Sequence, residues 1–250
     1  MSEFENRVAL VTGGSRGIGR AIALRLAEAG ADVAISYATR RGPADETAAQ
    51  IRALGRKAYV AACNVGNHEE VLKIVEGARR ELGPIDYLAH CGAISNIADH
   101  NQLSYDIWQE TIQVNLTGAY SAVFAVKDEM IERGFGRIVV ISSIAALRPR
   151  KMQIHYASAK AGVIAMTRCC AEAFAPHNVR INCIAPGLIE TEMADVLTEE
   201  MKKTVIAGTP MGRLGKPEEI AEFAYFLLSE LSSFTTGQTM VASGGRVTIP

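Results

Sequence analysis

The stretch Thr12-Gly13-Gly14-Ser15-Arg16-Gly17-Ile18-Gly19 decides the fold of this chain. It follows a short apolar run and opens a segment of helical spacing. Gly13 permits a tight turn, Gly17 lets the backbone come close to a ligand, and Gly19 lets the helix pack closely on the strand. The start of such a helix offers free N–H groups and a positive dipole end to phosphate. In this strand–turn–helix context the glycines predict a dinucleotide site, and a merely structural turn is the alternative.

Apolar strand-like runs and helical segments alternate along the rest of the chain. Near-continuous apolar strands separated by helices are typical of a parallel sheet that helices cover on both faces. We therefore predict one α/β Rossmann domain over residues 1–250, with a doubly wound parallel sheet of about seven strands. Residues 1–100 are expected mainly to bind the cofactor, and residues 101–250 to supply catalysis and substrate binding. The predicted strands are 7–11, 32–37, 58–62, 85–89, 137–142, 179–184 and 239–241, and the predicted helices are 17–29, 43–54, 67–82, 104–133, 154–175 and a broken region at 188–228.

The composition narrows the class of protein. With 250 residues, 48% of them hydrophobic and 21% charged, the chain suits one domain with a substantial core. A formal net charge of −1 gives no basic face, so we expect no nucleic acid partner. No apolar run is long enough to span a membrane, and residues 1–7 lack the apolar stretch of a signal peptide, which favours a cytoplasmic location. The cysteines show no CxxC spacing and the histidines no zinc spacing, so we expect reduced thiols and no metal.

A second group of residues carries the candidate chemistry. Ser142-Ser143 ends the fifth predicted strand, at the edge of a parallel sheet where ligands bind. Tyr156 and Lys160 follow at helical i and i+4 spacing, which puts both side chains on one face. Free tyrosine titrates near pH ~10, and we expect the ammonium of Lys160 to lower that pKa. We predict that Tyr156 gives a proton to a substrate oxygen and that Ser143 hydrogen-bonds the same oxygen.

The end of the second predicted strand indicates which nicotinamide cofactor binds. Proteins that bind NAD place an acid there to hold the 2′-hydroxyl of the ribose. This sequence reads Tyr37-Ala38-Thr39-Arg40-Arg41 and has no acid. A guanidinium suits a 2′-phosphate because its fork binds phosphate oxygens in pairs. We therefore predict NADPH (NADP), with Arg16 and Arg40 as contacts and Arg41 as a weaker candidate; the alternative is that Arg40 and Arg41 are solvated loop charges.

Together these motifs resemble the short-chain dehydrogenases/reductases, and the resemblance covers essentially all 250 residues. It also includes Pro186-Gly187 and Gly244-Gly245. It implies hydride transfer between a nicotinamide cofactor and a carbonyl or alcohol, and a mobile substrate lid at about 188–212. It further implies that Asn115 completes a catalytic set with Ser143, Tyr156 and Lys160 by holding a water in a proton relay. The cofactor contacts that it implies are Gly13, Ser15, Arg16, Gly17, Ile18, Gly19, Arg40, Asn64, Val65, Cys91, Gly92, Tyr156, Lys160, Pro186, Gly187, Ile189 and Thr191.

Within that family the chain is most similar to the 3-oxoacyl-(acyl-carrier-protein) reductases. The similarity implies NADPH-dependent reduction of a ketone or 3-oxoacyl thioester to a secondary alcohol, a role in fatty acid biosynthesis, an acyl carrier protein as partner and a homotetramer. An enoyl-(acyl-carrier-protein) reductase or a general alcohol dehydrogenase of the same fold is the alternative. A nucleotide-binding protein without turnover is a more remote one.

Three segments depart from the family pattern. His90-Cys91-Gly92-Ala93 stands where the family usually has Asn-Asn-Ala-Gly, Asn64 replaces the usual acid after the third strand, and Ala242-Ser243 precedes the last glycine pair. We expect Asn64 still to reach the adenine. For His90 and Cys91 two alternatives stay open: they serve less well than the two asparagines, or His90 supplies a different hydrogen bond. A catalytic role for Cys91 is conceivable, and a packing role is favoured.

A small basic cluster, Arg148, Arg150 and Lys151, flanks the predicted site. It is suited to an acidic carrier protein or to the phosphates of a thioester carrier. The alternative interpretation is a solvated loop.

Overall fold

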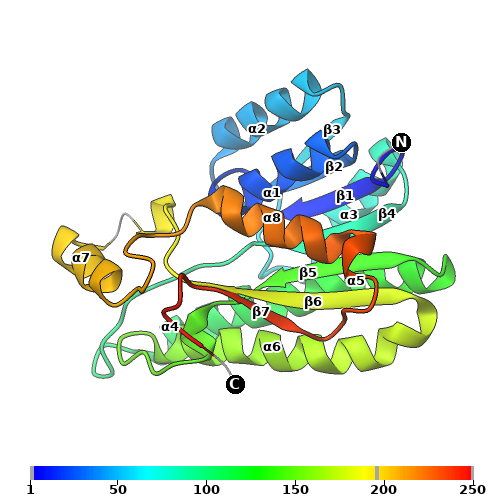
Figure 1. Ribbon diagram of the computed structural model, residues 1–250. Helices are drawn as coiled ribbons and strands as arrows, with labels where there is room; N and C mark the ends of the chain where they lie inside the picture. Colours follow the sequence, from blue (N-terminus) through cyan, green and yellow to red (C-terminus); the bar gives the residue numbers. More distant parts are fainter. Residues whose placement is uncertain (1–2, 195–196, 249–250) are drawn as a thin grey trace.

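The computed structural model describes residues 3–194 and 197–248. Its centre is a seven-stranded sheet in the order β3-β2-β1-β4-β5-β6-β7, in which all neighbouring strands are parallel (Figure 1). The prediction of a doubly wound parallel sheet is confirmed, and the predicted strand bounds hold to within two residues. The strands are β1 Val8–Thr12, β2 Asp32–Tyr37, β3 Ala58–Ala62, β4 Ile85–His90, β5 Gly136–Ile141, β6 Val179–Pro186 and β7 Thr239–Ala242.

Helices cover both faces of this sheet (Figure 1). Along β1, Ala9 and Val11 belong to one hydrophobic core, and Val8 and Leu10 belong to the other. This alternation follows from the two-residue period of a strand and explains why the strand is apolar throughout. The first core is closed by α1 Gly17–Glu28, α2 Arg41–Ala53 and α8 Pro217–Leu228, and the second by α3 His68–Leu82, α5 Gly118–Glu132 and α6 Ile154–Phe174.

Two predicted helices are wrong in detail. The single helix expected at 104–133 is divided into α4 Tyr105–Ile112, a π-helical turn at Gln113–Thr117, and α5. Such a turn inserts one extra residue into a helix, which a 3.6-residue pattern cannot reveal. The broken region at 188–228 resolves into a short 3-10 turn at Glu192–Ala194, α7 Glu199–Ala207 and α8. The first two lie in the predicted lid, of which residues 195–196 fall outside the described part of the chain.

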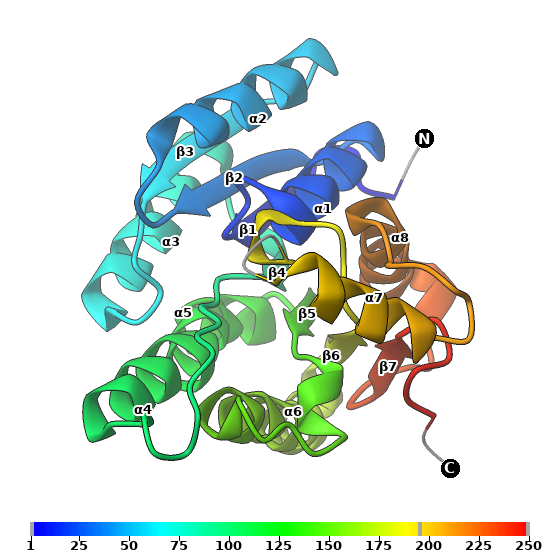
Figure 2. The same ribbon diagram turned by 90° about the vertical axis from the view of Figure 1, so that its left-hand side faces the viewer.

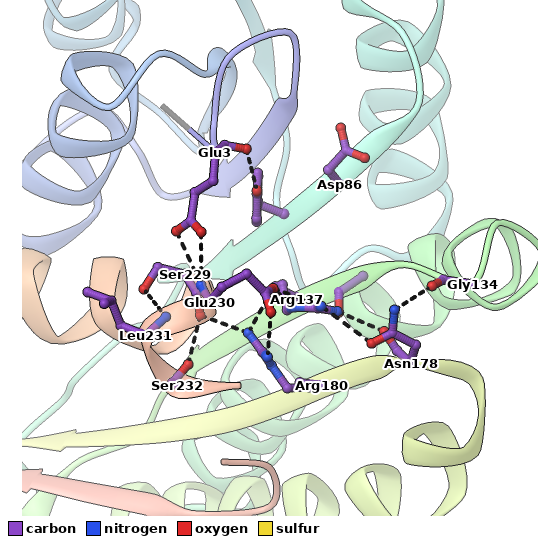
Figure 3. Close-up of polar contacts among 12 residues, drawn as sticks. Glu3, Asp86, Gly134, Arg137, Asn178, Arg180, Ser229, Glu230, Leu231 and Ser232 are labelled. Atoms are coloured by element: carbon purple, nitrogen blue, oxygen red, sulfur yellow. Dashed lines mark hydrogen bonds and ion pairs between the residues drawn. The ribbon is translucent and has the colours of Figure 1, made fainter. Parts of the chain in front are cut away.

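A polar cluster holds the amino ends of the central strands together (Figure 3). The side chains of Arg137 on β5 and Arg180 on β6 are almost fully buried, and both contact the Glu230 carboxylate, at 2.9 and 3.4 Å. The Glu3 carboxylate accepts the backbone N–H of Glu230 at 3.1 Å. Asp86 pairs with two further arginines nearby. Buried arginines at this edge of the sheet are therefore paired with carboxylates. The glycine turn lies at the opposite edge, where we expect the ligand to bind.

Candidate active site

The glycine turn is built so that side chains would not fit. Gly13 has a φ of +65°, and a Cβ there would lie 3.0 Å from the Gly92 nitrogen. A Cβ on Gly19 would lie 2.2 Å from the Gly13 carbonyl oxygen, so only glycine allows α1 to start this close to β1. Arg16, at the N-cap of α1, makes no side-chain capping bond. The N–H groups of the first turn and the bare glycine surface therefore fit a pyrophosphate group.

The other predicted site segments meet this turn at the carboxyl edge of the sheet (Figure 2). Pro186 ends β6, and the following Gly187 donates its N–H to the Ala242 carbonyl at 2.8 Å. The lid then crosses to the glycine turn, where a Cβ on Gly17 would lie 3.1 Å from Thr191 Cγ2. Residues far apart in sequence, from the first turn and from the lid, thus come together where the sequence predicts a cofactor.

Ser143, Tyr156 and Lys160 also meet at this edge. Tyr156 is buried, and the Ser143 hydroxyl is near enough to act on its pKa. Lys160 is buried one helical turn further along α6, with its Nζ 5.8 Å from the centre of the Tyr156 ring. Its ammonium donates to the Ile141 carbonyl at 2.8 Å, and the Lys160 carbonyl accepts from Ser142 Oγ at 2.8 Å. These two bonds fix the start of α6 against the end of β5.

The electrostatics of this group differ from the expectation in one respect. Burial raises the pKa of Tyr156, and the polar interaction with Ser143 and the charge of Arg150 only oppose that rise. We expected Lys160 to lower the pKa of Tyr156, but its charge is not among the influences that act on this phenol. Burial lowers the pKa of Lys160 itself to about 8. Tyr156 is accordingly a protonated phenol at neutral pH.

Asn115 lies fully buried in the π-helical turn. Its Oδ1 accepts the Ile94 N–H at 2.9 Å, and its Nδ2 donates to the Ile94 carbonyl at 2.8 Å. The side chain therefore ties the turn to the loop that follows β4. This contact positions Asn115, and its part in a proton relay stays a prediction.

Arg16 and Arg40 both contact one carboxylate. This carboxylate does not come from the end of β2, where proteins that bind NAD place an acid. Glu192 in the lid contacts Arg16 Nη1 at 2.5 Å and also pairs with Arg40. All three side chains are about half exposed. Arg41 instead pairs with Asp45 at 3.1 Å along α2. The two arginines that the sequence singles out can thus surround one anionic group.

A further group of predicted contact residues lies on the adenosine side of the cofactor site. Asn64 is exposed, and its Oδ1 accepts the Gly66 N–H at 3.0 Å. Val65 is buried against Gly92, where a Cβ would lie 2.8 Å from Val65 Cγ1. Burial raises the pKa of Cys91 to about 12, so its sulfur is a thiol and not a ready nucleophile. This agrees with a packing role for Cys91.

His90 makes the different hydrogen bond that its place suggests. Thr12 Oγ1 accepts the N–H groups of Cys91 and Gly92, at 3.1 and 3.3 Å, which uses both lone pairs. Its own proton is then directed at His90 Nδ1, 2.9 Å away. The ring proton must sit on Nε2, which is buried without a hydrogen-bond partner among the described residues. Burial, together with the charge of Lys160, lowers the pKa of His90 to about 3, so the ring stays neutral.

The residues that the structure describes contain neither a metal-binding cluster nor a membrane-spanning helix. No group of three or more His, Cys, Asp or Glu side chains is placed to hold a metal ion. No helix within 3–194 or 197–248 is both long and apolar enough to cross a membrane.

Sequence reasoning missed three residues of this site: Thr12, Glu192 and Arg246. Thr12 was quoted only as the start of the glycine stretch, and its contact with His90 depends on the pairing of β1 with β4. Glu192 reaches Arg16 from the lid, and Arg246, which follows β7, donates to the Val205 carbonyl on α7. No local pattern marks either residue, because each meets its neighbours only in the folded chain.

Comparison with known proteins agrees with this geometry. The family model described as Enoyl-(Acyl carrier protein) reductase matches residues 13–246. The L-rhamnose 1-dehydrogenase (NAD(P)(+)) of Sphingomonas sp. is 38% identical over 248 residues, 98% of each chain. The 3-oxoacyl-(acyl-carrier-protein) reductase of Aquifex aeolicus is 38% identical over 246 residues, 97% of this chain and 98% of that protein. The crystal structure of a candidate gluconate dehydrogenase from Agrobacterium tumefaciens has a TM-score of 0.93 at 32% identity, covering 99% of this chain and 98% of that one. This chain therefore belongs to the short-chain dehydrogenases/reductases, a family of NAD(P)-dependent oxidoreductases.

Proposed function

We propose that this enzyme uses NADPH to reduce a ketone to a secondary alcohol. The observation that carries the proposal is that Tyr156 and Lys160 are buried together, with the Ser143 hydroxyl near Tyr156, at the edge of the sheet that also holds the glycine turn. A protonated phenol next to a hydroxyl suits donation of a proton to an oxygen that gains negative charge.

Each residue then has a definite task. A nicotinamide bound at this edge supplies hydride to the carbonyl carbon when the enzyme reduces its substrate. Ser143 Oγ hydrogen-bonds the substrate oxygen, and Tyr156 Oη transfers its proton to that oxygen. Lys160 holds α6 in place through its hydrogen bond to the Ile141 carbonyl. Asn115 keeps the loop after β4 beside the reacting groups through its two bonds to Ile94.

The choice of NADPH rests on Arg16 and Arg40. No carboxylate stands at the end of β2 to hold a 2′-hydroxyl. Both guanidiniums reach the single carboxylate of Glu192, which supports a pocket of the right charge for a 2′-phosphate. A phosphate with two negative charges would compete well with that carboxylate.

The substrate is proposed as a ketone, including a 3-oxoacyl thioester. Retention of Ser143 and the Ser143–Tyr156 spacing favour C=O over C=C reduction, although the matching family model carries the name of an enoyl reductase. Of the relatives, one is named for a 3-oxoacyl group and one for a sugar, L-rhamnose, so the proposed substrate class is wider than fatty acyl chains. An acyl carrier protein as partner and a homotetrameric assembly stay predictions.

A carbonyl panel with NADPH and NADH tests the proposal. We expect turnover of ketones with NADPH, a higher kcat/KM with NADPH than with NADH, and no reduction of enoyl thioesters. Reduction of C=C bonds alone would instead establish the enoyl reductase. Tight NADPH binding without turnover of any carbonyl or alcohol would favour a nucleotide-binding protein without catalysis.

A further inference from the structure

Three arginines come from two distant parts of the chain, and one of them, Arg150, is hydrogen-bonded to the N-cap residue of α6, the helix that holds Tyr156. Arg148 and Arg150 lie in the loop between a 3-10 turn at Ile144–Ala146 and α6, and Arg246 lies after β7. Burial lowers the pKa of Arg150, and repulsion from Arg148 adds to this effect. Burial likewise lowers the pKa of Arg246, and repulsion from Arg148 and Arg150 adds to it. The three guanidiniums are therefore within electrostatic reach of one another. We call this group the arginine triad.

The fold holds Arg246 in place through a tight turn. Ser243 Oγ accepts the Val247 N–H at 3.1 Å, and the Arg246 N–H donates to the Ser243 carbonyl at 3.2 Å. Arg246 Nη1 then donates to the Val205 carbonyl on α7 at 2.5 Å. A Cβ on Gly208 would lie 2.6 Å from the same nitrogen, so the glycine leaves room for the guanidinium. The segment after β7 passes close to α7 (Figure 2).

Arg150 is fixed from the other side. Its Nε donates to Gln153 Oε1 at 3.3 Å, and Gln153 Nε2 donates to Ser95 Oγ at 3.0 Å. The charge of Arg150 acts on Tyr156, whose pKa it lowers against the effect of burial. A group bound to Arg150 therefore lies close to the proposed proton donor.

The triad has no acidic partner within 3–194 or 197–248: no carboxylate there lies within ion-pair distance of Arg148, Arg150 or Arg246. All three are partly buried, and burying cations without a counter-charge is costly. Arg137 and Arg180 at the opposite edge share Glu230, so the fold does supply counter-charges to other buried arginines.

Lys151 does not belong to the triad. It is exposed, and its charge acts on Asp99, whose pKa it helps to lower. The basic cluster of the sequence is thus rearranged: Lys151 leaves it and Arg246 joins it from the far end of the chain.

We propose that the arginine triad is a binding subsite for an anionic group, a carboxylate or phosphate, on a substrate whose carbonyl lies at Tyr156. This inference rests on the proposed function, since it places the reacting carbonyl at Tyr156. The substrate class it names is that of oxo acids and phosphorylated ketones. A guanidinium is the side chain best suited to both anions, because it binds two oxygens at once.

Matched pairs of substrates test the subsite. The probes are acetoacetate and levulinate against their methyl esters, and dihydroxyacetone phosphate against dihydroxyacetone. We expect wild-type kcat/KM to favour at least one anion over its neutral partner. Arg150→Gln and Arg246→Gln should each reduce that preference about 10- to 100-fold, as loss of a charged hydrogen bond does. Comparing ratios cancels any general effect of Arg150 on Tyr156. The carboxylate and phosphate arms show which anion the triad takes.

Lys151→Gln is the matched control, because it removes a neighbouring positive charge that faces Asp99; its ratio should stay at the wild-type value. Arg246→Lys should restore part of the preference that Arg246→Gln loses. Reduction of neutral ketones with no anion preference, or an equal change of ratio in the control, overturns the subsite and leaves the proposed function standing.

A binding measurement covers the case in which no carbonyl is reduced. Calorimetric titration of the NADP-saturated protein with butanoate, and with inorganic phosphate, should show binding that Arg150→Gln weakens and Lys151→Gln does not. Butanamide serves as the neutral probe. Absence of anion binding to the wild type in this titration would overturn the subsite whatever the activity.

Discussion

Acidification from pH 7 to about 4.5 is expected to destabilise the fold through His90. In the folded protein its pKa is about 3, whereas in the unfolded chain histidine titrates near ~6.5. The folded state binds fewer protons over this interval, so the stability is complete above pH ~6.5 and is lost as the pH falls toward 3. At pH 4.5, two pH units below ~6.5, the lost stability corresponds to about 3 kcal/mol, and the loss over the whole interval corresponds to about 5 kcal/mol.

The structure explains why protonation is so unfavourable. His90 Nδ1 accepts the only proton of Thr12 Oγ1, whose two lone pairs are already used by Cys91 and Gly92. A second proton on the ring would therefore face a donor, in a buried site that also holds the charge of Lys160. A neutral amide at this position does not titrate, so His90→Asn should remove the part of the pH dependence of stability that His90 causes.

Urea unfolding of the wild type and His90→Asn at both pH values provides the assay. Carboxylates elsewhere also titrate over this range, and taking the difference between the two proteins removes their contribution. The free energy of unfolding of the wild type, relative to the variant, should fall by about 3 kcal/mol between pH 7 and 4.5. His177→Asn, at an exposed position, should change with pH as the wild type does. Parallel pH dependence in the wild type and His90→Asn would refute this reasoning.

Two further variants, one double and one single, probe the cofactor pocket and the polar cluster at the opposite edge of the sheet. Replacing Arg16 and Arg40 together by Gln should reduce the kcat/KM preference for NADPH over NADH about 10- to 100-fold, because the 2′-phosphate loses its charged hydrogen bonds; an unchanged ratio would show that they are solvated loop charges. Glu230→Gln should lower the free energy of unfolding by about 1–3 kcal/mol, because buried Arg137 and Arg180 lose their shared counter-charge; equal stability in urea would show that this carboxylate, itself half exposed, contributes nothing.

Local sequence patterns were enough for most of the fold. The strands ending at Thr12 and Pro186 could be located because buried parallel strands are continuously apolar and glycine or proline ends them. The π-helical turn at Asn115 could not, since one inserted residue leaves the helical periodicity nearly unchanged. Some helix bounds differ from the prediction for another reason: the side-chain pattern constrains the middle of a helix better than its ends.

The site was predictable only where its parts are contiguous in sequence. The glycine turn and the Tyr156–Lys160 pair each lie on one element, so spacing alone places their side chains together. Glu192 and Arg246 meet their partners through the tertiary fold and carry no local signal. The pKa of Tyr156 was misjudged because spacing shows that Lys160 is near but not how deeply the phenol is buried, and burial raises this pKa.

The substitution Tyr156→Phe tests the central claim most directly. It removes only the hydroxyl that is proposed to give its proton to the substrate and keeps the ring that fills the buried site. With a ketone that the wild type reduces, kcat/KM should fall by about 100-fold or more, since general acid catalysis contributes 10²–10⁴-fold. The Kd for NADPH, from a fluorescence titration, should change little. Full ketone reduction by the phenylalanine variant would contradict the account.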